Sequence, residues 1–330
     1  MKAIVHEGKN GLAGLAYKEM TTAKPKANEV RVQLKAAGMN HRDLFVLERH
    51  SSSEPPLIIG SDGAGIIEAV GDDVKDLQIG DEVIINPGLG WDENTPAPPD
   101  HFEILGLPDH GTFAEYITIA AKNVFKKPKH LQFIEAGVLP LAALTAYRAL
   151  FTRGNIQANQ TLLLPGIGGG VATFILQFAK AIGATVYVTS RSAEKRQAAL
   201  SLGADRAIDS NADWSQSLNN EKVDLVIESV GAATFDQSLA QLRKGGTIVA
   251  FGSSTGDTIQ LNLRDFFYGQ YNFLGSTMGS AEEFQEMLDF IDTHQIKPII
   301  DEVYPLSEFH DAFLKLQNAK QFGKIAFQID

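Results

Sequence analysis

Cysteine does not occur in this chain of 330 residues. Its absence excludes disulfides, thiolate nucleophiles and every zinc site built on cysteine. Positive charge is also scarce, with 29 Lys and Arg residues against 40 Asp and Glu residues and a formal net charge of −11. Such a surface repels phosphate backbones and anionic lipid, so we expect neither nucleic acid nor a membrane as partner.

Long apolar runs are missing as well. The sequence has no run of about 18 apolar residues, and its first ten residues hold one apolar triplet, so neither a membrane span nor a signal peptide is predicted. With no cysteine to oxidise, a cytoplasmic location is the expectation. The composition, 44% hydrophobic and 21% charged, is that of a globular chain, and the length favours two domains.

The chain changes character along its length. Up to about residue 124 it holds short β-type runs separated by glycine, proline and aspartate. From about residue 132, β-type runs alternate with helix-length segments, which predicts a parallel sheet covered by helices on both faces. After residue 279 come two amphipathic helices and a last strand over residues 324–329, which we expect to return to the first domain.

A glycine cluster separates an apolar strand from an amphipathic helix within residues 162–191. Glycines let the backbone approach a pyrophosphate, whose charge then meets the free N–H groups of a helix N-terminus. The cluster alone also fits a tight strand-to-helix turn, but the complete strand–loop–helix–strand unit predicts dinucleotide binding. The loop residues expected to bind are Gly166, Gly168, Gly169, Gly170 and Val171.

The end of the second strand of this unit predicts which dinucleotide binds. NAD sites place a carboxylate there for the ribose diol, whereas this chain has Ser190 and Arg191, with Lys195 one turn later. A hydroxyl and a guanidinium bind a 2′-phosphate, which a carboxylate would repel. NADPH is therefore the expected cofactor. The same residues also fit a solvated helix start with Ser192 as its N-cap.

Seven landmarks occur in the order typical of the medium-chain dehydrogenase/reductase superfamily, which the chain resembles along nearly its whole length. They are residues 36–43 (AAGMNHRD), 60–71 (GSDGAGIIEAVG), 111–116 (GTFAEY), 139–150 (LPLAALTAYRAL), the glycine loop, 202–205 (LGAD) and 323–327 (GKIAF). The resemblance implies an α/β fold with a GroES-like β-rich catalytic domain, residues 1–122 and 279–330, and a Rossmann doubly wound parallel-sheet domain, residues 123–278. It also implies a homo-oligomer, dimer or tetramer, paired along residues 271–276.

The zinc alcohol dehydrogenases of this family hold a catalytic metal with a Cys, a His and a second Cys. At the matching positions this chain has Asn40, Ser61 and Leu141, with Asp62 in place of the family's Glu. Leucine and asparagine are not plausible zinc ligands and a neutral hydroxyl is a poor one, so no metal is expected. The loop over residues 88–110, placed like the family's structural-zinc lobe, would hold an ion only if its histidines and carboxylates converged.

These departures resemble the zinc-independent branch of quinone oxidoreductases and enone or enoyl-thioester reductases. Without a Lewis acid, an electron-poor acceptor is easier to reduce than a carbonyl whose alkoxide needs stabilising. The resemblance implies NADPH-dependent hydride transfer to a small-molecule electron-poor acceptor, a quinone or an α,β-unsaturated carbonyl compound, in the cleft between the domains. Two alternatives stay open: an acryloyl- or enoyl-thioester reductase, and an NADPH-binding protein without physiological turnover.

The candidate catalytic residues are Asn40, Asp43 and Asp62. We expect the Asn40 amide to donate to a developing oxyanion, and the two carboxylates to orient it or to hold a positive partner. The family resemblance implies Lys324 as that partner, since it matches a position where a basic residue often meets the acidic one. Asn40 and Asp43 also fit a helix capping box that needs no chemistry. Arg42 is expected to face solvent or the opposite domain.

The rest of the cofactor site is expected at the carboxyl ends of later strands, where open α/β sheets bind ligands. Val230, Phe251, Gly252 and Ser253 follow two such strands and are expected to line the ribose and nicotinamide. By the family resemblance, Asn40 and Thr145 are also expected beside the nicotinamide. For Thr145, packing within its helix is the alternative.

Overall fold

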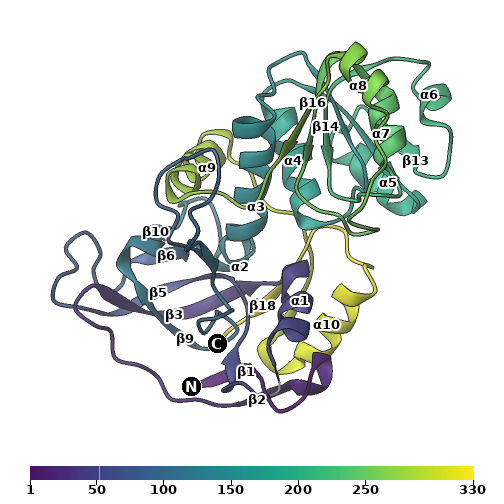
Figure 1. The fold of residues 1–330 in the computed structure, drawn as a ribbon. Helices are drawn as coiled ribbons and strands as arrows, with labels where there is room; N and C mark the ends of the chain where they lie inside the picture. Colours follow the sequence, from purple (N-terminus) through teal and green to yellow (C-terminus); the bar gives the residue numbers. More distant parts are fainter. Residues whose placement is uncertain (52) are drawn as a thin grey trace. The chain divides into compact units, whose positions relative to one another are not determined.

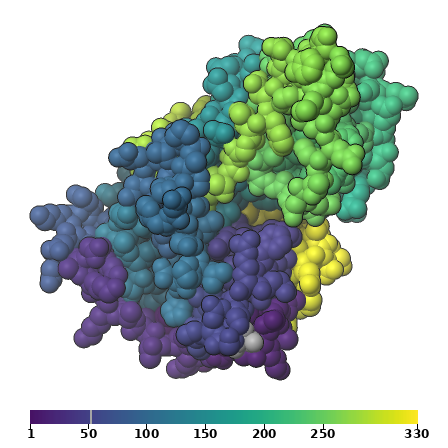
Figure 2. All heavy atoms as spheres, in the orientation of Figure 1, coloured from purple at the N-terminus to yellow at the C-terminus, as the bar shows by residue number. Residues whose placement is uncertain are grey.

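The computed structural model describes residues 1–51 and 53–330, which form two compact units (Figure 1). The first unit comprises Met1–Leu144 and Gly279–Asp330, and the second unit comprises Thr145–Met278. Figure 2 shows both ends of the colour range, purple and yellow, in the first unit. Within the described part of the chain, no helix has the length and apolar character needed to cross a membrane.

The first unit is built on antiparallel pairing. A seven-stranded sheet has the order β10-β6-β5-β3-β18-β17 with β9 also paired to β3, and a three-stranded sheet has the order β2-β1-β4. Only β17 and β18 pair in parallel within these sheets. The strands are β1 (Lys2–His6), β2 (Leu15–Glu19), β3 (Glu29–Gly38), β4 (Leu57–Ile58), β5 (Asp62–Val70), β6 (Glu82–Ile85), β7 (Gly88–Leu89), β8 (Glu103–Ile104), β9 (Tyr116–Ala120), β10 (Val124–Lys126), β17 (Ile300–Pro305) and β18 (Lys324–Gln328).

The helices of the first unit lie between and after these strands (Figure 1). The final strand β18 pairs with β3, so the end of the chain returns to the first unit as the sequence predicted. The helical elements are η1 (Gly11–Gly14), α1 (His41–Arg49), η2 (Ala121–Asn123), α2 (Phe133–Gly137), the start of α3 (Pro140–Tyr147), α9 (Ala281–His294), η4 (Leu306–Glu308) and α10 (Phe309–Gln317).

The first boundary between the units falls inside α3, whereas the sequence-based boundary lies between residues 122 and 123. Two contacts explain the difference. The strand β10 pairs with β6, and α2 packs against β3 so closely that a Cβ on Gly137 would lie 2.8 Å from that of Ala36. The segment between residues 123 and 144 is thus bound to the sheet of the first unit.

The core of the first unit explains the glycine that precedes Ser61. Buried and partly exposed residues alternate along β3, as expected for a strand with one face on a core. The ring of Phe113 packs edge-to-face against Phe327 at 5.0 Å and lies directly over Gly60. A Cβ at Gly60 would come within 2.3 Å of that ring, and its φ of +98° also favours glycine. The absence of a side chain at Gly60 lets the backbone turn into β5 beneath the core.

The second unit holds a six-stranded sheet in the order β13-β12-β11-β14-β15-β16, with every neighbouring pair parallel. Counted from β11, this is the doubly wound order 3-2-1-4-5-6, whose direction reverses between β11 and β14. The α/β fold with a doubly wound parallel sheet is therefore confirmed. The strands are β11 (Thr161–Leu164), β12 (Thr185–Ser190), β13 (Arg206–Asp209), β14 (Val223–Glu228), β15 (Leu242–Ala250) and β16 (Asn272–Gly275).

Helices connect the parallel strands of the second unit, and Figure 1 shows them on both sides of the sheet. They are the π-helix η3 (Arg148–Arg153), α4 (Gly170–Ala181), α5 (Ala193–Ser201), α6 (Trp214–Ser217), α7 (Phe235–Gln241) and α8 (Leu263–Gly269). The strand β16 is an edge of the sheet, and α8 before it exposes Leu263, Phe267 and Tyr268. Association along this edge stays a prediction.

Candidate functional site

Asn40 lies between the end of β3 and the start of α1. Its backbone N–H donates to Asp43 Oδ2 at 2.7 Å, and the backbone N–H of Asp43 donates to the Asn40 carbonyl at 2.9 Å. The predicted capping box between Asn40 and Asp43 is present at this helix start. The two ends of the Asn40 amide also contact Asp62 and Lys324, so the amide is held rigidly.

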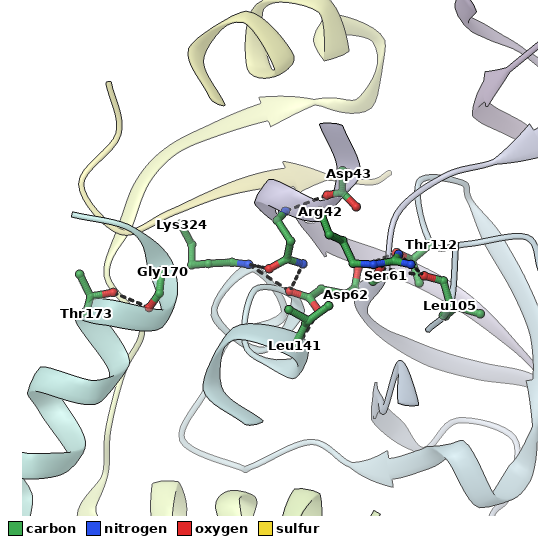
Figure 3. Close-up of polar contacts among 11 residues, drawn as sticks. Arg42, Asp43, Ser61, Asp62, Leu105, Thr112, Leu141, Gly170, Thr173 and Lys324 are labelled. Carbon is green, nitrogen blue, oxygen red and sulfur yellow. Dashed lines mark hydrogen bonds and ion pairs between the residues drawn. The ribbon is translucent and has the colours of Figure 1, made fainter. Parts of the chain in front are cut away.

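Asp62, the first residue of β5, is fully buried and is the centre of a polar network (Figure 3). Its Oδ2 accepts from Asn40 Nδ2 at 2.9 Å and from Lys324 Nζ at 3.1 Å. Its Oδ1 accepts from the backbone N–H of Leu141 at 2.8 Å. Lys324 Nζ also donates to Asn40 Oδ1 at 2.6 Å, which closes the triangle. Lys324 is therefore the partner of Asp62 that the sequence suggested.

The charge on this network follows from the direction of its hydrogen bonds. Burial raises the pKa of Asp62 above its usual value, while the Lys324 ammonium, the Asn40 amide and the Leu141 N–H oppose the rise. All three of these groups donate, and an ionised carboxyl is acceptor-only. The geometry thus favours a buried carboxylate paired with a buried ammonium, with the Asn40 amide between them.

Asp43 is buried beside this network without a comparable set of partners. Its Oδ2 accepts the Asn40 N–H, but its Oδ1 has no hydrogen-bond partner among the described residues. Burial raises the pKa of Asp43 to about 7, and the Asn40 N–H and the charge of Arg42 only partly offset that effect. Asp43 therefore changes charge near neutral pH, unlike an ordinary aspartate.

Arg42 corrects one expectation, since it does not simply face solvent. Its Nη1 donates to Ser61 Oγ and to the Leu105 carbonyl, both at 2.9 Å, and Ser61 Oγ donates to the same carbonyl at 2.8 Å (Figure 3). Burial lowers the pKa of the guanidinium. Arg42 thus ties the start of β5 to the chain after β8, and it stands beside Asp62 without an ion pair to it in the described structure.

The residues present do not fit a catalytic zinc. Zinc needs converging lone pairs from nitrogen, sulfur or carboxylate oxygen. Here Asn40 Oδ1 accepts from Lys324, Ser61 Oγ is held by Arg42, and Leu141 contributes only a backbone N–H. Two positive side chains therefore already bind the polar atoms that a divalent cation would need. Among the residues that the structure describes, no three His, Asp or Glu side chains gather at a metal-binding distance.

The loop over residues 88–110 is held by the protein itself. Trp91 is buried against Phe102 at 5.2 Å. The carbonyls of Trp91 and Asp92 accept the N–H groups of Ala281 and Glu282 in the first turn of α9, at 2.8 and 3.1 Å. The carboxylate of Asp92 pairs with Lys122, and His110 Nδ1 accepts from the Ile58 N–H, so these two groups are engaged in separate places. The packing of Trp91 on Phe102 and the hydrogen bonds to the start of α9 thus hold this loop in place, as metal ligands would in a structural-zinc lobe.

In the second unit, the glycine loop joins β11 to α4 at the reversal point of the sheet. Gly169 is the N-cap of α4, Gly170 and Val171 are its first residues, and Gly169 has open space where a side chain would stand. The loop is tied to β12 by the Ile167 N–H, which donates to the Thr189 carbonyl at 2.8 Å. Backbone N–H groups at this helix start suit a pyrophosphate.

Gly166 and Gly168 have distinct reasons to be glycine. Gly166 has φ +75°, and a Cβ there would lie 2.6 Å from Val230 Cγ2. Gly168 has φ +140°, and a Cβ there would lie 2.8 Å from Lys195 Cδ and 3.1 Å from its Nζ. The Lys195 ammonium therefore reaches over the loop, which adds positive charge where phosphate is expected. Side chains at these two positions would fill the space beside the loop, so the glycines leave room for a dinucleotide.

The end of β12 keeps the residues proposed to select the cofactor. Ser190 is buried, its Oγ accepts the Ser192 N–H at 3.2 Å, and Ser192 caps α5 as expected. Arg191 is exposed and has no ion-pair partner among the described residues. Asp209 is the register partner of Ser190 on β13, but its carboxylate pairs with Arg196 at 3.0 Å. The local charge near Arg191 is thus positive, which suits a 2′-phosphate.

The remaining predicted cofactor residues lie at strand ends or in α3. Val230 follows β14, and Phe251, Gly252 and Ser253 follow β15, at the same edge of the sheet as the glycine loop. Thr145, buried in α3, is the first residue of the second unit. Their contacts with a cofactor stay predictions.

Two contributors to the site around Asp62 were not found from the sequence: Arg42 and the backbone of Leu141. Leu141 follows Pro140 at the start of α3, and first-turn N–H groups of a helix lack partners within it, so its free N–H could have been expected. No signal in the sequence indicated the direction of the Arg42 side chain.

Comparisons with known proteins agree with this architecture. One family profile, described as alcohol dehydrogenase GroES-like domain, matches residues 26–129, and another, described as zinc-binding dehydrogenase, matches residues 170–293. The zinc-type alcohol dehydrogenase-like protein YogA of Leptosphaeria maculans is 34% identical over 331 residues, which cover 92% of each chain. The expected GroES-like domain beside a Rossmann-type domain is thus confirmed.

Solved structures share the whole fold. A crystal structure of an NAD-dependent alcohol dehydrogenase matches with a TM-score of 0.92 and 32% identity over 100% of both chains. The 2-octenoyl-CoA carboxylase reductase CinF, solved in complex with NADP and 2-octenoyl-CoA, matches with a TM-score of 0.88 and 25% identity, covering 99% of this chain and 87% of that one. Similar folds therefore serve both NAD and NADP, and both alcohols and enoyl thioesters.

Proposed function

Because this chain belongs to the medium-chain dehydrogenase/reductase superfamily of oxidoreductases, we propose that it is an NADPH-dependent reductase of quinones or α,β-unsaturated carbonyl compounds that works without a catalytic metal. The observation that carries the proposal is the triangle of Asn40, Asp62 and Lys324, in which a buried ammonium binds the groups at the metal-site positions. Without a Lewis acid to stabilise an alkoxide, the favoured acceptors are those whose reduced form delocalises its negative charge.

NADPH as cofactor is supported by the end of β12. Arg191 has no ion-pair partner among the described residues, the nearby Asp209 is neutralised by Arg196, and Arg191 stands where NAD enzymes use a carboxylate. Lys195 and the glycine loop offer charge and N–H groups to the phosphates. When bound, the reduced nicotinamide supplies the hydride.

The residues of the chain then have to stabilise the acceptor oxygen on which negative charge develops. Asn40 Nδ2 gives one N–H to Asp62, and no described residue accepts the other. The Asp62–Lys324 pair fixes the plane of that amide, so its second N–H is preorganised as a donor. Asp62 accepts from three donors and is unsuited to release a proton, so we assign protonation of the carbon or oxygen to water.

The test is a screen of NADPH oxidation by the purified full-length chain against a quinone, an alkenal and crotonyl-CoA. We expect oxidation above the blank with the quinone or the alkenal, and faster turnover with NADPH than with NADH. The relation to a CoA-thioester reductase makes crotonyl-CoA the second candidate substrate. Binding of NADPH with no oxidation above the blank for any acceptor would instead identify a binding protein.

The matched variant for this screen is Asn40→Leu, which keeps the volume near the network but removes the donor. We expect turnover to fall by about 10²-fold, as for other oxyanion donors, with NADPH affinity changed much less. Unchanged turnover in Asn40→Leu would show that Asn40 takes no part in the mechanism. The reductase activity itself would still be decided by the screen.

A further inference from the structure

Glu228 is a buried carboxylate that none of the preceding chemistry uses. It ends β14, with 1% of its surface exposed, and it accepts hydrogen bonds from four donor groups. Its Oε1 accepts the backbone N–H groups of Val230 at 2.8 Å and Gly231 at 3.2 Å. Both of its oxygens contact the Thr234 hydroxyl at 3.0 Å, and Oε2 accepts from Ser238 Oγ at 2.7 Å. No Lys or Arg pairs with it among the described residues.

These bonds hold the loop that follows β14 in one conformation. The loop turns at Gly231, whose φ is +92°. It is also joined to the loop after β15, because Thr255 donates to the Val230 carbonyl from its N–H at 2.8 Å and from its hydroxyl at 2.7 Å. The Ala233 N–H donates in turn to the Thr255 hydroxyl at 3.0 Å. The two strand-end loops thus form one bonded assembly with Glu228 at its buried end.

This assembly lies at the reversal point of the sheet, where ligands of such sheets bind. Val230, which is half-buried, is close enough to the glycine loop that a Cβ on Gly166 would meet Val230 Cγ2 at 2.6 Å. A displacement of Val230 would therefore change the packing at Gly166, the first glycine of the phosphate-binding loop. The carboxylate sets the position of Val230 by accepting its N–H group.

We propose that Glu228 is a positioning residue of the cofactor site, which holds the Val230 loop against the nicotinamide half of NADPH. The inference rests on the proposed function, since it assumes that NADPH is the ligand of this sheet edge. The proposed role depends on the hydrogen-bond acceptor that Glu228 provides and does not depend on its negative charge. An amide oxygen could serve the Val230 and Gly231 N–H groups equally well, because the Thr234 and Ser238 hydroxyls can turn to accept from an amide nitrogen.

The experiment compares Glu228→Leu and Glu228→Gln with the unchanged full-length chain. Two ligands are titrated, NADPH and adenosine 2′-monophosphate, which has no 5′-phosphate to occupy the glycine loop and should rely on Ser190 and Arg191. For Glu228→Leu we expect NADPH to bind ~10-fold more weakly and adenosine 2′-monophosphate to bind within about twofold of the original. For Glu228→Gln we expect NADPH affinity to return to within about threefold of the original.

The matched control is Glu283→Leu, which removes another fully buried carboxylate that accepts at a helix start, in the first unit. It should lower stability without changing the ratio of the two affinities. If Glu228→Leu does not fold, Glu228→Asp withdraws the carboxylate from the loop and should weaken NADPH in the same selective way, by a smaller factor.

Three results would overturn the inference. The first is unchanged NADPH affinity in Glu228→Leu and Glu228→Asp. The second is equal weakening of both ligands, which would mean general damage to the second unit. The third is failure of Glu228→Gln to restore binding. If the unchanged chain binds neither ligand, the proposed function fails together with the inference, and that outcome is distinguished from the other three by the wild-type titration alone.

Discussion

Replacing Asp43 with asparagine should stabilise the protein at neutral and higher pH. Burial raises the pKa of Asp43 from its ordinary value of 3.8 to about 7, and its Oδ1 has no partner among the described residues. The folded protein therefore holds this proton more tightly than the unfolded chain does. The substituted amide would keep an acceptor for the Asn40 N–H and would not need to ionise.

The sign and size follow from proton linkage. Between about pH 4 and pH 7, the unfolded chain has lost the Asp43 proton while the folded protein retains it, so the free energy of unfolding falls as pH rises. A pKa rise of about three corresponds to about 4 kcal/mol once the pH is above 7. Asp43→Asn removes this cost, so its advantage over the original chain should be near zero at pH 4 and up to about 4 kcal/mol at pH 8.

Urea unfolding followed by tryptophan fluorescence measures this difference. The chain has two tryptophans, both buried, of which Trp91 lies in the first unit with Asp43 and Trp214 lies in the second. A Trp214→Phe background makes the signal specific to the first unit. Asp72, which is exposed and has no partner in the described structure, provides the control substitution Asp72→Asn. A difference between Asp43→Asn and the original chain that does not grow with pH would refute the reasoning.

Two further predictions follow from the same contacts. Lys324→Met should lower the free energy of unfolding by about 3–5 kcal/mol, because it leaves Asp62 buried without its cation, and adding Asp62→Asn should recover part of the loss. An equally unstable double variant would contradict the buried-pair interpretation. Arg191→Ala should weaken NADPH by about tenfold relative to NADH, since a charged hydrogen bond to the 2′-phosphate is lost. An equal loss for both cofactors, measured by titration, would remove Arg191 from cofactor selection.

The sequence was most informative where structure depends on neighbours along the chain. Apolar runs before and after the glycine cluster predicted the parallel sheet, and the Ser190–Arg191 strand end was located correctly. The pairing of Asp62 with Lys324 was also predicted, although only through a family resemblance that places residues 262 positions apart together.

Contacts between distant segments were the part that could not be predicted. The Arg42 guanidinium is oriented by a carbonyl 63 residues further on, and nothing near Arg42 in the sequence indicates that carbonyl. The Asn40 amide also contacts Asp62 and Lys324, which lie 22 and 284 residues further along the chain, and the capping-box pattern gives no sign of either contact. The unit boundary shifted to α3 for the same reason, since strand pairing of β10 is tertiary.

The most direct measurement is NADPH oxidation by protein whose metal content has been determined, with and without a strong chelator and with added zinc. Because the Asn40–Asp62–Lys324 network stands in place of a metal, we expect a quinone- or alkenal-dependent rate that is the same in all three conditions. The protein should hold far less than one zinc per chain. A rate that disappears with the chelator and returns with zinc would contradict it.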